Sequence, residues 1–301
     1  MRFTQLRDFL AAVKAGSLRG GAQALGISQP AITKSVRQLE DELRVKLLQR
    51  SGRGATATQA GKALLTRARV IQAELAKIEQ DLDELRGRHG GSVVVGVSPA
   101  AAVLLVPEAV QGLRRSAPEV RVRFVEGLAH SLMALVRDET LDFSIALKLN
   151  DKPDSAIRFT PLVRVQMIIA GRRGHPLANA KSLRELAEAS WITFSQPGRE
   201  GFVDRSHRAA GLPPPRAVVQ CESYASALAL MARTDAIGLI VPQLLEEPYC
   251  KGALQPIRIR EPIPAQTFGI FRRVDAPLSP AASAMAEAVK AAARELARAN
   301  R

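Results

Sequence analysis

The sequence predicts a multidomain protein of the α+β and α/β classes, with an N-terminal winged helix-turn-helix, a long linker helix and a two-lobed α/β domain. Three observations predict this organisation: two short amphipathic helices meeting at Gly26, a heptad series after Thr58, and strands alternating with helices from Ser92 onward. The expected domains are residues 1–58, 59–90 and 91–301, the last with one lobe of about 91–161 and 267–301 and another of about 162–266.

The stretch Ser17–Arg44 has the pattern of a helix-turn-helix. A helix over Leu18–Leu25 is expected to end at Gly26, where a positive φ angle is favoured, and a second helix to begin at a Ser28 cap. The second helix turns an apolar face inward at steps of four, three and four, through Ile32, Val36, Leu39 and Leu43. Its other side carries donors suited to base edges and phosphates, so the expected DNA contacts are Ser28, Gln29, Pro30, Thr33, Lys34 and Arg37. A helical hairpin with a solvated polar face is the alternative.

The preceding segment is expected to support this motif. Phe3–Ala15 has a continuous apolar stripe of a helix, and Thr4 can cap its start. Gly20 and Gly21 lie inside the short helix that follows, where each costs about 1 kcal/mol relative to Ala. They indicate either a close approach between helices or local flexibility.

A basic hairpin is expected after the second helix of the motif. Leu47 and Leu48 can anchor one strand and Ala55–Ala57 the returning strand, with Arg50 and Arg53 near the turn. Beside a helix-turn-helix, such a hairpin is a wing that touches the phosphate backbone or the minor groove. A solvated basic turn is the alternative.

The linker segment carries a coiled-coil pattern. Thr58 can cap a helix that runs to about Arg86, and its apolar side chains recur at steps of four and three. This is a dimerisation seam, formed by Leu64, Ala68, Ile71, Leu75, Ile78, Leu82 and Leu85. A dimer would hold two recognition helices at a set separation, as a partly palindromic DNA site requires.

Beyond Ser92 the sequence alternates between strands and helices, which predicts parallel sheets in two lobes with a ligand cleft between them. Strands are expected at Val93–Val97, Val120–Val125, Phe143–Leu147, Leu162–Ala170, Trp191–Phe194, Ala217–Cys221, Gly238–Val241 and Gln266–Phe271. Helices are expected at Ala100–Ser116, His130–Asp138, Leu183–Ala189, Phe202–Ala210, Ser223–Arg233 and Pro280–Ala299.

Composition narrows the function class. The 301 residues carry a formal net charge of +14, and residues 1–70 hold 13 Lys and Arg against 4 Asp and Glu, so the basic excess gathers around the helix-turn-helix. Two distant cysteines and four scattered histidines predict no metal site and no cofactor, and suit a reducing compartment. The absence of a signal peptide or an apolar span predicts a cytoplasmic protein without a membrane partner.

Over its whole length the chain resembles the LysR-type bacterial transcriptional regulators. The most specific part is the sequence from Ser17 to Gly61, which is close in order and spacing to the family's N-terminal signature, although Gly20 and Gly21 replace an alanine-rich form. The resemblance implies an effector-binding domain shaped like periplasmic solute-binding proteins. It also implies a homodimer that commonly pairs into a tetramer and bends promoter DNA; RNA polymerase is a further expected partner.

The resemblance also points to an effector site. It implies a carboxylate or another anion at the helix start formed by Ser98, Pro99, Ala100 and Ala101, where the free N–H groups of the first turn attract it. Other matching positions are Gly127, Leu128, Leu147, Ser195, Gln196 and Phe202. Family members often have polar side chains where Leu128 and Leu147 stand, so a partly apolar effector such as an aromatic or fatty acid is expected. Arg199 either closes over the carboxylate or is an exposed loop arginine.

The expected function is therefore a sequence-specific transcriptional regulator, a dimer or dimer of dimers on promoter DNA, controlled by a small anionic and partly apolar effector. An enzyme is the main alternative, but the chain has no nucleophile elbow, phosphate loop or paired metal ligands. A nucleoid protein that coats DNA without sequence preference is another, although it would leave the two-lobed half without a purpose.

Overall fold

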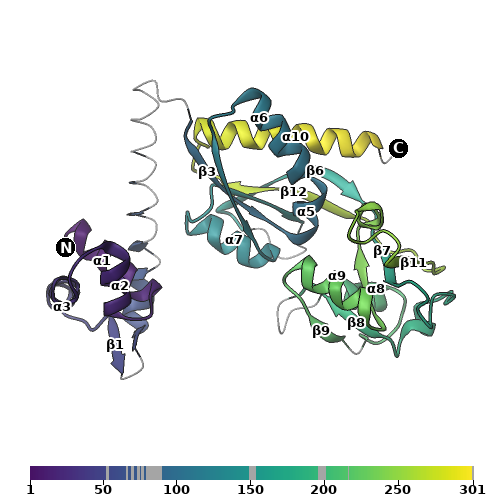
Figure 1. The fold of residues 1–301 in the computed structure, drawn as a ribbon, viewed down its shortest axis with the longest axis horizontal. Helices are drawn as coiled ribbons and strands as arrows, with labels where there is room; N and C mark the ends of the chain where they lie inside the picture. The colour runs from purple at the N-terminus through teal and green to yellow at the C-terminus, as the bar shows by residue number, and fades with distance from the viewer. Residues whose placement is uncertain are drawn as a thin grey trace. The chain divides into compact units, whose positions relative to one another are not determined.

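The computed structural model describes residues 1–51, 54–65, 67–68, 71–72, 75, 78, 90–148, 154–195, 201–215 and 217–299. The chain divides into two compact units, Met1–Arg86 with Asp138–Thr140, and Gly87–Arg137 with Leu141–Arg301. The helices and strands of both units are labelled in Figure 1.

The first unit is a helix-turn-helix with a supporting helix and a two-stranded hairpin. Its elements are α1 (Phe3–Lys14), α2 (Leu18–Leu25), α3 (Gln29–Leu43), β1 (Leu48–Ser51) and β2 (Gly54–Ala57), close to the bounds that the sequence predicts. The strands pair antiparallel, with Leu48 opposite Ala57 and Ser51 opposite Gly54. The predicted winged helix-turn-helix is confirmed.

The ends of these helices follow from their capping residues. Ser28 Oγ accepts the Ala31 amide at 3.3 Å, and α2 ends at Gly26 in the left-handed conformation, with φ of 65°. The predicted Thr4 cap is wrong, because α1 already begins at Phe3 and Arg2 occupies the N-cap position. Local capping chemistry therefore sets the turn of the motif.

Close packing explains one of the two glycines inside α2. A Cβ on Gly21 would lie 2.8 Å from the backbone of Ala12, so α1 and α2 approach closely there. A Cβ on Gly20 would instead meet side-chain atoms at 3.0 Å. The small core beneath the three helices and the hairpin contains Leu6, Phe9, Leu10, Ala12, Ala22, Ile32, Val36, Leu39, Leu47, Leu48, Ala55 and Ala68.

The linker segment begins as a helix. Its described residues, 59–65, 67–68, 71–72, 75 and 78, are all helical. Thr58 caps the segment as predicted, since its Oγ1 accepts the Gly61 amide at 3.0 Å. Leu82 and Leu85 of the predicted seam lie outside the described residues.

The second unit contains two five-stranded mixed sheets. The first has the order β4-β3-β5-β12-β6, where β3 (Ser92–Val97) lies parallel to both β4 (Arg121–Glu126) and β5 (Phe143–Leu147). The strands β12 (Gln266–Arg273) and β6 (Ile157–Val165) complete it in antiparallel pairing. A strand from late in the chain thus closes the first sheet, as the sequence predicts.

The second sheet has the order β11-β7-β10-β8-β9. The strand β8 lies parallel to its neighbours β9 and β10, whereas β7 runs antiparallel to β10 and β11. The strands are β7 (Ile168–Arg172), β8 (Ser190–Thr193), β9 (Ala217–Gln220), β10 (Ala236–Ile240) and β11 (Leu254–Ile257). The chain passes between the sheets twice, once from β6 to β7 and once from β11 to β12.

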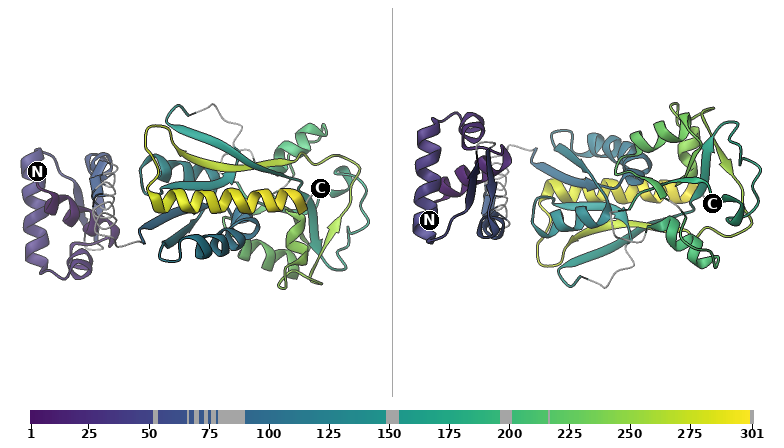
Figure 2. Two further views of the ribbon diagram at one scale, coloured as in Figure 1. Left: turned by 90° about the horizontal axis from the view of Figure 1, so that it is seen from above. Right: turned by 90° about the horizontal axis from the view of Figure 1, so that it is seen from below.

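The side chains of β3 alternate between the two faces of the first sheet, and both faces are covered by helices. Val93 and Val95 join the large core that includes α10 (Pro280–Ala299), whereas Val94 packs with α7 (Ala129–Arg137). Figures 1 and 2 show α10 beside α6 (Val106–Ser116) on one face, and Figure 1 shows α7 on the other. In the second sheet, α9 (Tyr224–Arg233) packs against β7 and β10, and His207 of α8 (Phe202–Ala209) packs edge-on against Trp191 of β8.

Three sequence-based assignments in this unit are wrong. The predicted helix Ala100–Ser116 is two helices, α5 (Pro99–Leu104) and α6, because Leu105 has non-helical angles and Pro107 supplies no N–H to α5. The predicted strand Leu162–Ala170 is split between β6 and β7 in different sheets. The predicted helix Leu183–Ala189 is a single 3₁₀ turn, Arg184–Leu186, and a second such turn spans Pro242–Glu246.

Candidate functional site

The first candidate site is the exposed face of α3. Ser28, Gln29, Pro30, Lys34 and Arg37 are exposed and Thr33 is half-buried, all on one side of the helix. The opposite side is closed, because Ile32, Val36 and Leu39 have no exposed surface. The structure therefore brings the predicted recognition residues together on the accessible side of α3, while the other side of the helix is buried in the core.

The hairpin supplies the second part of this surface. Arg50 lies in β1 opposite Ala55, but its side chain and the whole of Arg53 lie outside the described residues. Ala55 donates its amide to the Gly16 carbonyl at 2.8 Å, which joins β2 to the turn between α1 and α2. The hairpin is thus attached to the helical group by its backbone.

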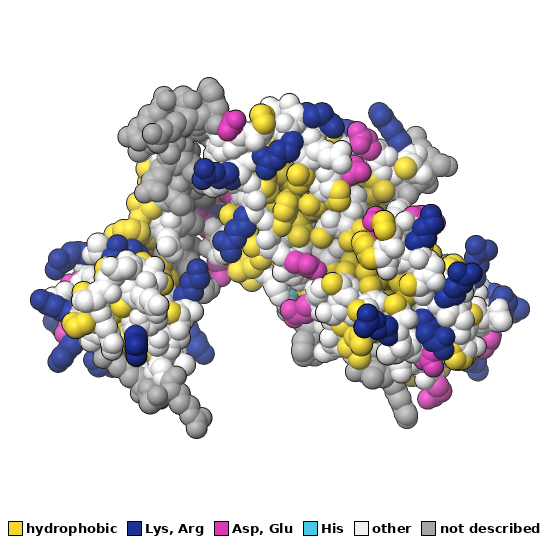
Figure 3. Space-filling view, viewed as in Figure 1, with side chains coloured by type: hydrophobic (Ala, Val, Ile, Leu, Met, Phe, Trp, Pro, Cys, Tyr) yellow, Lys and Arg dark blue, Asp and Glu magenta, His cyan; other side chains and the backbone are white. Residues whose placement is uncertain are grey.

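The charge of this unit suits a polyanion. In Figure 3, Lys and Arg side chains are spread over the visible face of the helix-turn-helix unit, and acidic side chains are sparse there. This agrees with the 13 basic and 4 acidic residues among residues 1–70. Such an excess attracts DNA phosphates through release of their counterions.

One buried carboxylate connects α3 to the hairpin, and the sequence analysis does not identify it. Glu40 is 4% exposed, and its Oε1 accepts the amides of Leu47 at 2.8 Å and Leu48 at 3.1 Å. Its Oε2 pairs with Lys46 Nζ at 3.0 Å. Burial alone would raise the pKa of Glu40, but these hydrogen bonds outweigh burial and lower the pKa below 4.5. The available signal was an acidic residue four positions after Val36, on the apolar face of α3.

The described seam residues fall into two groups. Ala68 is buried in the core of its own unit, and Leu64 packs against that core. Ile71 and Ile78 are 39% and 51% exposed, and Leu75 is half-buried. Ile71 and Ile78 thus remain exposed within the chain.

The second candidate site is a cavity of about 350 Å³ in the second unit. It is lined from both sheets, by residues after β3 and β5 on one side and around β8 and α8 on the other. Of the predicted effector residues, seven line it: Ser98, Pro99, Ala100, Leu128, Leu147, Ser195 and Phe202. Ala101 is fully buried and Gly127 only adjoins the lining, whereas Gln196 and Arg199 lie outside the described residues.

The polarity of the lining is uneven. Ser98 is 6% exposed, and its Oγ has no hydrogen-bond partner. Lys148, His130 and Arg205 also line the cavity, the Arg205 guanidinium lying 5.7 Å from the centre of the Phe202 ring, and none of the described lining residues is acidic. A buried unpaired donor, the cationic Lys148 and Arg205 side chains and the absence of a carboxylate among the described lining residues favour an anionic ligand.

Most of the wall is apolar, and the sequence missed much of it. The additional apolar or aromatic lining residues are Ala129, Met167, Ile192, Phe194, Val203, Tyr224 and Leu239, with Gln266 as a further polar residue and Gly201 beside it. Tyr224 packs edge-on against Phe194, at 4.8 Å between ring centres, and burial raises the pKa of its phenol. These residues lie far apart in the sequence, so only the fold brings them together.

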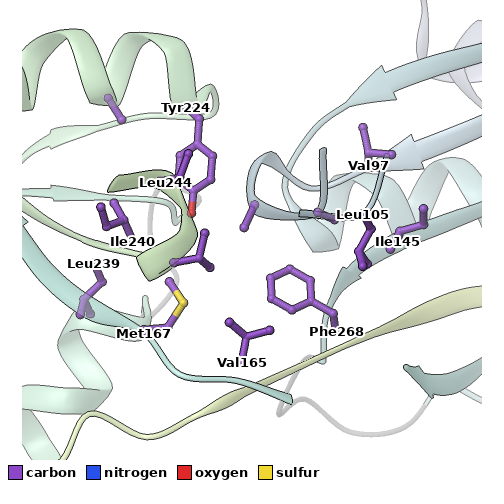
Figure 4. Packing of buried hydrophobic residues seen from close by; sticks show 14 of the residues in the cluster. Val97, Leu105, Ile145, Val165, Met167, Tyr224, Leu239, Ile240, Leu244 and Phe268 are labelled. Atoms are coloured by element: carbon purple, nitrogen blue, oxygen red, sulfur yellow. The ribbon is translucent and has the colours of Figure 1, made fainter. Parts of the chain in front are cut away.

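The core beneath the cavity continues from one sheet to the other. Figure 4 shows Val97, Leu105 and Ile145 on the side of the first sheet, and Leu239, Ile240 and Leu244 on the side of the second. Val165, Met167 and Phe268, close to the segments that cross between the sheets, lie between these groups. A shared core therefore supports both walls.

Comparison with known proteins agrees with this architecture. Residues 3–62 match the bacterial regulatory helix-turn-helix protein, lysR family, and residues 86–294 match the LysR substrate binding domain. The transcriptional regulator GbpR of Azospirillum brasilense is 30% identical over 299 residues, which cover 97% of this chain and 86% of GbpR. The SDS degradation transcriptional activation protein of a Pseudomonas species is 26% identical, over 93% of each chain.

A solved structure shows the same fold. Full-length CbnR in complex with its target DNA matches with a TM-score of 0.72 and 23% identity, covering 97% of this chain and all of CbnR. The chain belongs to the LysR family of DNA-binding transcriptional regulators, with an effector-binding domain after the helix-turn-helix. The expectation of a regulator rather than an enzyme is thereby confirmed by the named homologues.

Metal ions and membranes are two further classes of possible partner. Among the described residues, no three His, Cys, Asp or Glu side chains gather into a group able to hold a metal ion. Within that same part of the chain, every helix is too short or too polar to cross a bilayer.

Proposed function

We propose that this regulator recognises specific promoter sequences as a dimer or a dimer of dimers, and that a small anionic, partly apolar effector controls it. The observation that carries the effector class is the cavity between the two sheets, where the buried Ser98 hydroxyl lacks a partner in a mostly apolar wall that also contains Lys148 and Arg205. DNA recognition is assigned to the residues up to about 58, dimerisation to the segment up to about residue 90, and effector binding to the rest of the chain.

DNA recognition is assigned to the exposed side of α3 and to the hairpin. Gln29, Pro30, Thr33, Lys34 and Arg37 would meet base edges and phosphates in the major groove, while Ser28 caps the helix and meets a phosphate. Arg50 and Arg53 would touch the backbone or the minor groove from the wing. The DNA complex of CbnR, which shares this fold, supports this assignment.

Dimerisation is assigned to the linker segment. Ile71 and Ile78 expose large apolar side chains one heptad apart, the spacing that a coiled-coil partner covers. The seam would run through Leu75, Leu82 and Leu85. Leu64 and Ala68 would belong both to the seam and to the core of the helix-turn-helix unit. Pairing of two dimers and contact with RNA polymerase complete the proposal, and the protein would act in the bacterial cytoplasm, where promoter DNA is found.

The DNA half of the proposal is tested by selection from a random-sequence duplex library with the purified full-length chain. The expected result is a partly palindromic site whose half-sites are about one helical turn apart or a multiple of it. Uniform recovery of all duplexes, or a monomer in sedimentation experiments, would contradict it.

The effector half is tested by thermal unfolding of the full-length chain with a panel of small molecules. Benzoate, octanoate and octyl sulfate test the anionic apolar class, and octyl sulfate is included because one relative is named for SDS degradation. Octylammonium reverses the charge and glucose removes both features. An anion that binds the folded chain raises the melting temperature, while octylammonium and glucose do not; stabilisation by octylammonium alone would overturn the assignment.

A further inference from the structure

The segment Lys46–Leu48, at the root of the wing, is held from two sides. Its amides are bound by α3, because Glu40 Oε1 accepts both the Leu47 and the Leu48 N–H groups. Its carbonyls are bound by the linker segment: the Thr58 amide donates to the Leu47 carbonyl at 2.9 Å, and Thr58 Oγ1 donates to the Lys46 carbonyl at 2.6 Å. The backbone of these three residues therefore joins α3 to the start of the linker segment, to which dimerisation is assigned.

Packing leaves little room for this backbone to move. Leu47 and Leu48 are buried in the core of the unit. A Cβ on Gly61 would lie 2.1 Å from the Leu47 carbonyl oxygen, so the first turn of the linker segment packs directly on that peptide. A displacement of Leu47 would consequently disturb its hydrogen bonds both to Glu40 of α3 and to Thr58 at the start of the linker segment.

Glu40 is the side chain on which the α3 half of this connection depends. The two amides that it accepts lie seven and eight residues away in the sequence, so no local turn supplies an alternative acceptor. Lys46, which pairs with Oε2, is 71% exposed, so water screens its charge and the ion pair contributes little. The acceptor oxygen Oε1, rather than the charge, is therefore the feature that matters.

We propose that Glu40 is a positioning residue that sets the wing relative to the recognition helix and, through Lys46–Leu48 and Thr58, relative to the dimerising segment. This inference rests on the proposed DNA contacts of α3 and the wing. Without the Glu40 acceptor, α3 would still reach the major groove, but the wing would no longer be held against the DNA backbone. The predicted consequence is a change in the mode of DNA binding rather than a uniform loss.

The variants separate the acceptor from the charge. Glu40→Gln keeps an oxygen able to accept both amides while it removes the charge, whereas Glu40→Leu removes the acceptor. Asp41→Asn makes the same charge change at an exposed position one residue further along α3. Each variant is made in the full-length chain, and its DNA-competent fraction is determined by titration with the duplex that the wild type selects.

The expected result for Glu40→Leu is at least a tenfold weaker affinity for the selected duplex, with less than a threefold change on a random duplex at low salt. Losing a wing–phosphate contact should also reduce the slope of log Kd against log salt by about one. In hydroxyl-radical footprints, protection of the DNA backbone by the wing should disappear, while dimethyl sulfate probing should still show protection of guanine N7 in the major groove. Glu40→Gln and Asp41→Asn should remain within threefold of the wild type with an unchanged slope.

Two outcomes would overturn the proposal. One is a Glu40→Leu chain that behaves like Asp41→Asn. The other is equal weakening on selected and random duplexes with an unchanged slope, which marks a merely structural role. If Glu40→Leu does not fold, Gly61→Ala is used in its place. Its added Cβ would displace the Leu47 carbonyl from the side of the linker segment and should give the same change in the footprint. Failure of the wild type to select any sequence would instead contradict the proposed function.

Discussion

Two buried polar groups, one in each unit, differ in how completely they are hydrogen-bonded. Glu40 in the helix-turn-helix unit is 4% exposed, and both of its carboxylate oxygens have partners. Ser98 in the two-lobed unit is 6% exposed, and its hydroxyl has none although it faces a cavity. Buried polar groups are normally paired, so the first serves to hold structure and the second is available to a ligand.

This contrast extends to the surfaces. In the helix-turn-helix unit the polar residues of α3 face outward and its apolar residues are buried in a packed core, which suits recognition of an external duplex. The two-lobed unit keeps its candidate recognition groups inside, around an apolar cavity. The following changes should therefore affect one function and spare the other.

The largest effect is expected from Arg37→Ala. Arg37 is exposed on the polar face of α3, and loss of a base or phosphate contact there should weaken binding to the selected duplex by about 1–3 kcal/mol, which is about fivefold to 150-fold. Dimerisation and ligand-induced stabilisation should be unchanged. Fluorescence anisotropy across a salt titration measures the effect, with Arg115→Ala in the second unit as the control of equal charge. Equal affinities for both variants would remove Arg37 from the interface.

A stability effect of similar size is expected from Gly21→Ala. The added Cβ would lie 2.8 Å from the Ala12 backbone, so α1 and α2 must separate, at a cost of about 1–3 kcal/mol in the free energy of unfolding. Gly20→Ala is the matched control, because its Cβ meets side-chain atoms at 3.0 Å and gains helix propensity. Urea unfolding followed by circular dichroism compares them. An unchanged or higher stability for Gly21→Ala would mean that the helices adjust freely.

A smaller effect is expected at the cavity. Ser98→Ala should leave the stability of the free chain unchanged or slightly higher, because it removes an unpaired buried hydroxyl, and should weaken anion binding by about 1 kcal/mol. Ser144→Ala is a close control: Ser144 is fully buried and its hydroxyl is also unpaired, but it does not line the cavity. Calorimetric titration with the best-binding anion measures both. Equal weakening by the two substitutions would show that Ser98 has no direct contact with the ligand.

The smallest effect is the pH dependence that Glu40 adds to the stability of the first unit. Its pKa is lower in the folded chain than the ordinary 4.5, so its contribution is complete above about pH 4.5 and is lost as the pH falls through the folded value. Glu40→Gln does not titrate and should flatten this part of the profile. Unfolding of both chains between about pH 3 and 6 tests the sign. A profile that steepens in the variant would contradict it.

The success of sequence-based prediction differs between the units for physical reasons. In the first unit the helices depend on local signals, such as the Ser28 cap, the positive φ of Gly26 and apolar steps of three and four. In the second unit the apolar run through Gln166 hides a crossing between two sheets. The edge strand β11 was missed because Pro256 lies within it, a residue tolerated only at sheet edges.

The candidate sites show the same division. The α3 face is contiguous in sequence, so its residues can be named from their spacing alone. Seven cavity residues can be named by family resemblance, but Met167, Tyr224 and Leu239 come from separate elements and meet only in the folded unit. Glu40 was missed because its partners lie beyond the end of its own helix.

Coupling between the effector cavity and DNA binding is tested most directly by a footprint of the full-length chain on its selected duplex, with and without the panel anion that stabilises the chain most. Two protected half-sites are expected, with an anion-dependent change in the extent of protection that Ser98→Ala shifts to higher anion concentration. Two half-sites whose protection no stabilising anion alters would contradict this coupling.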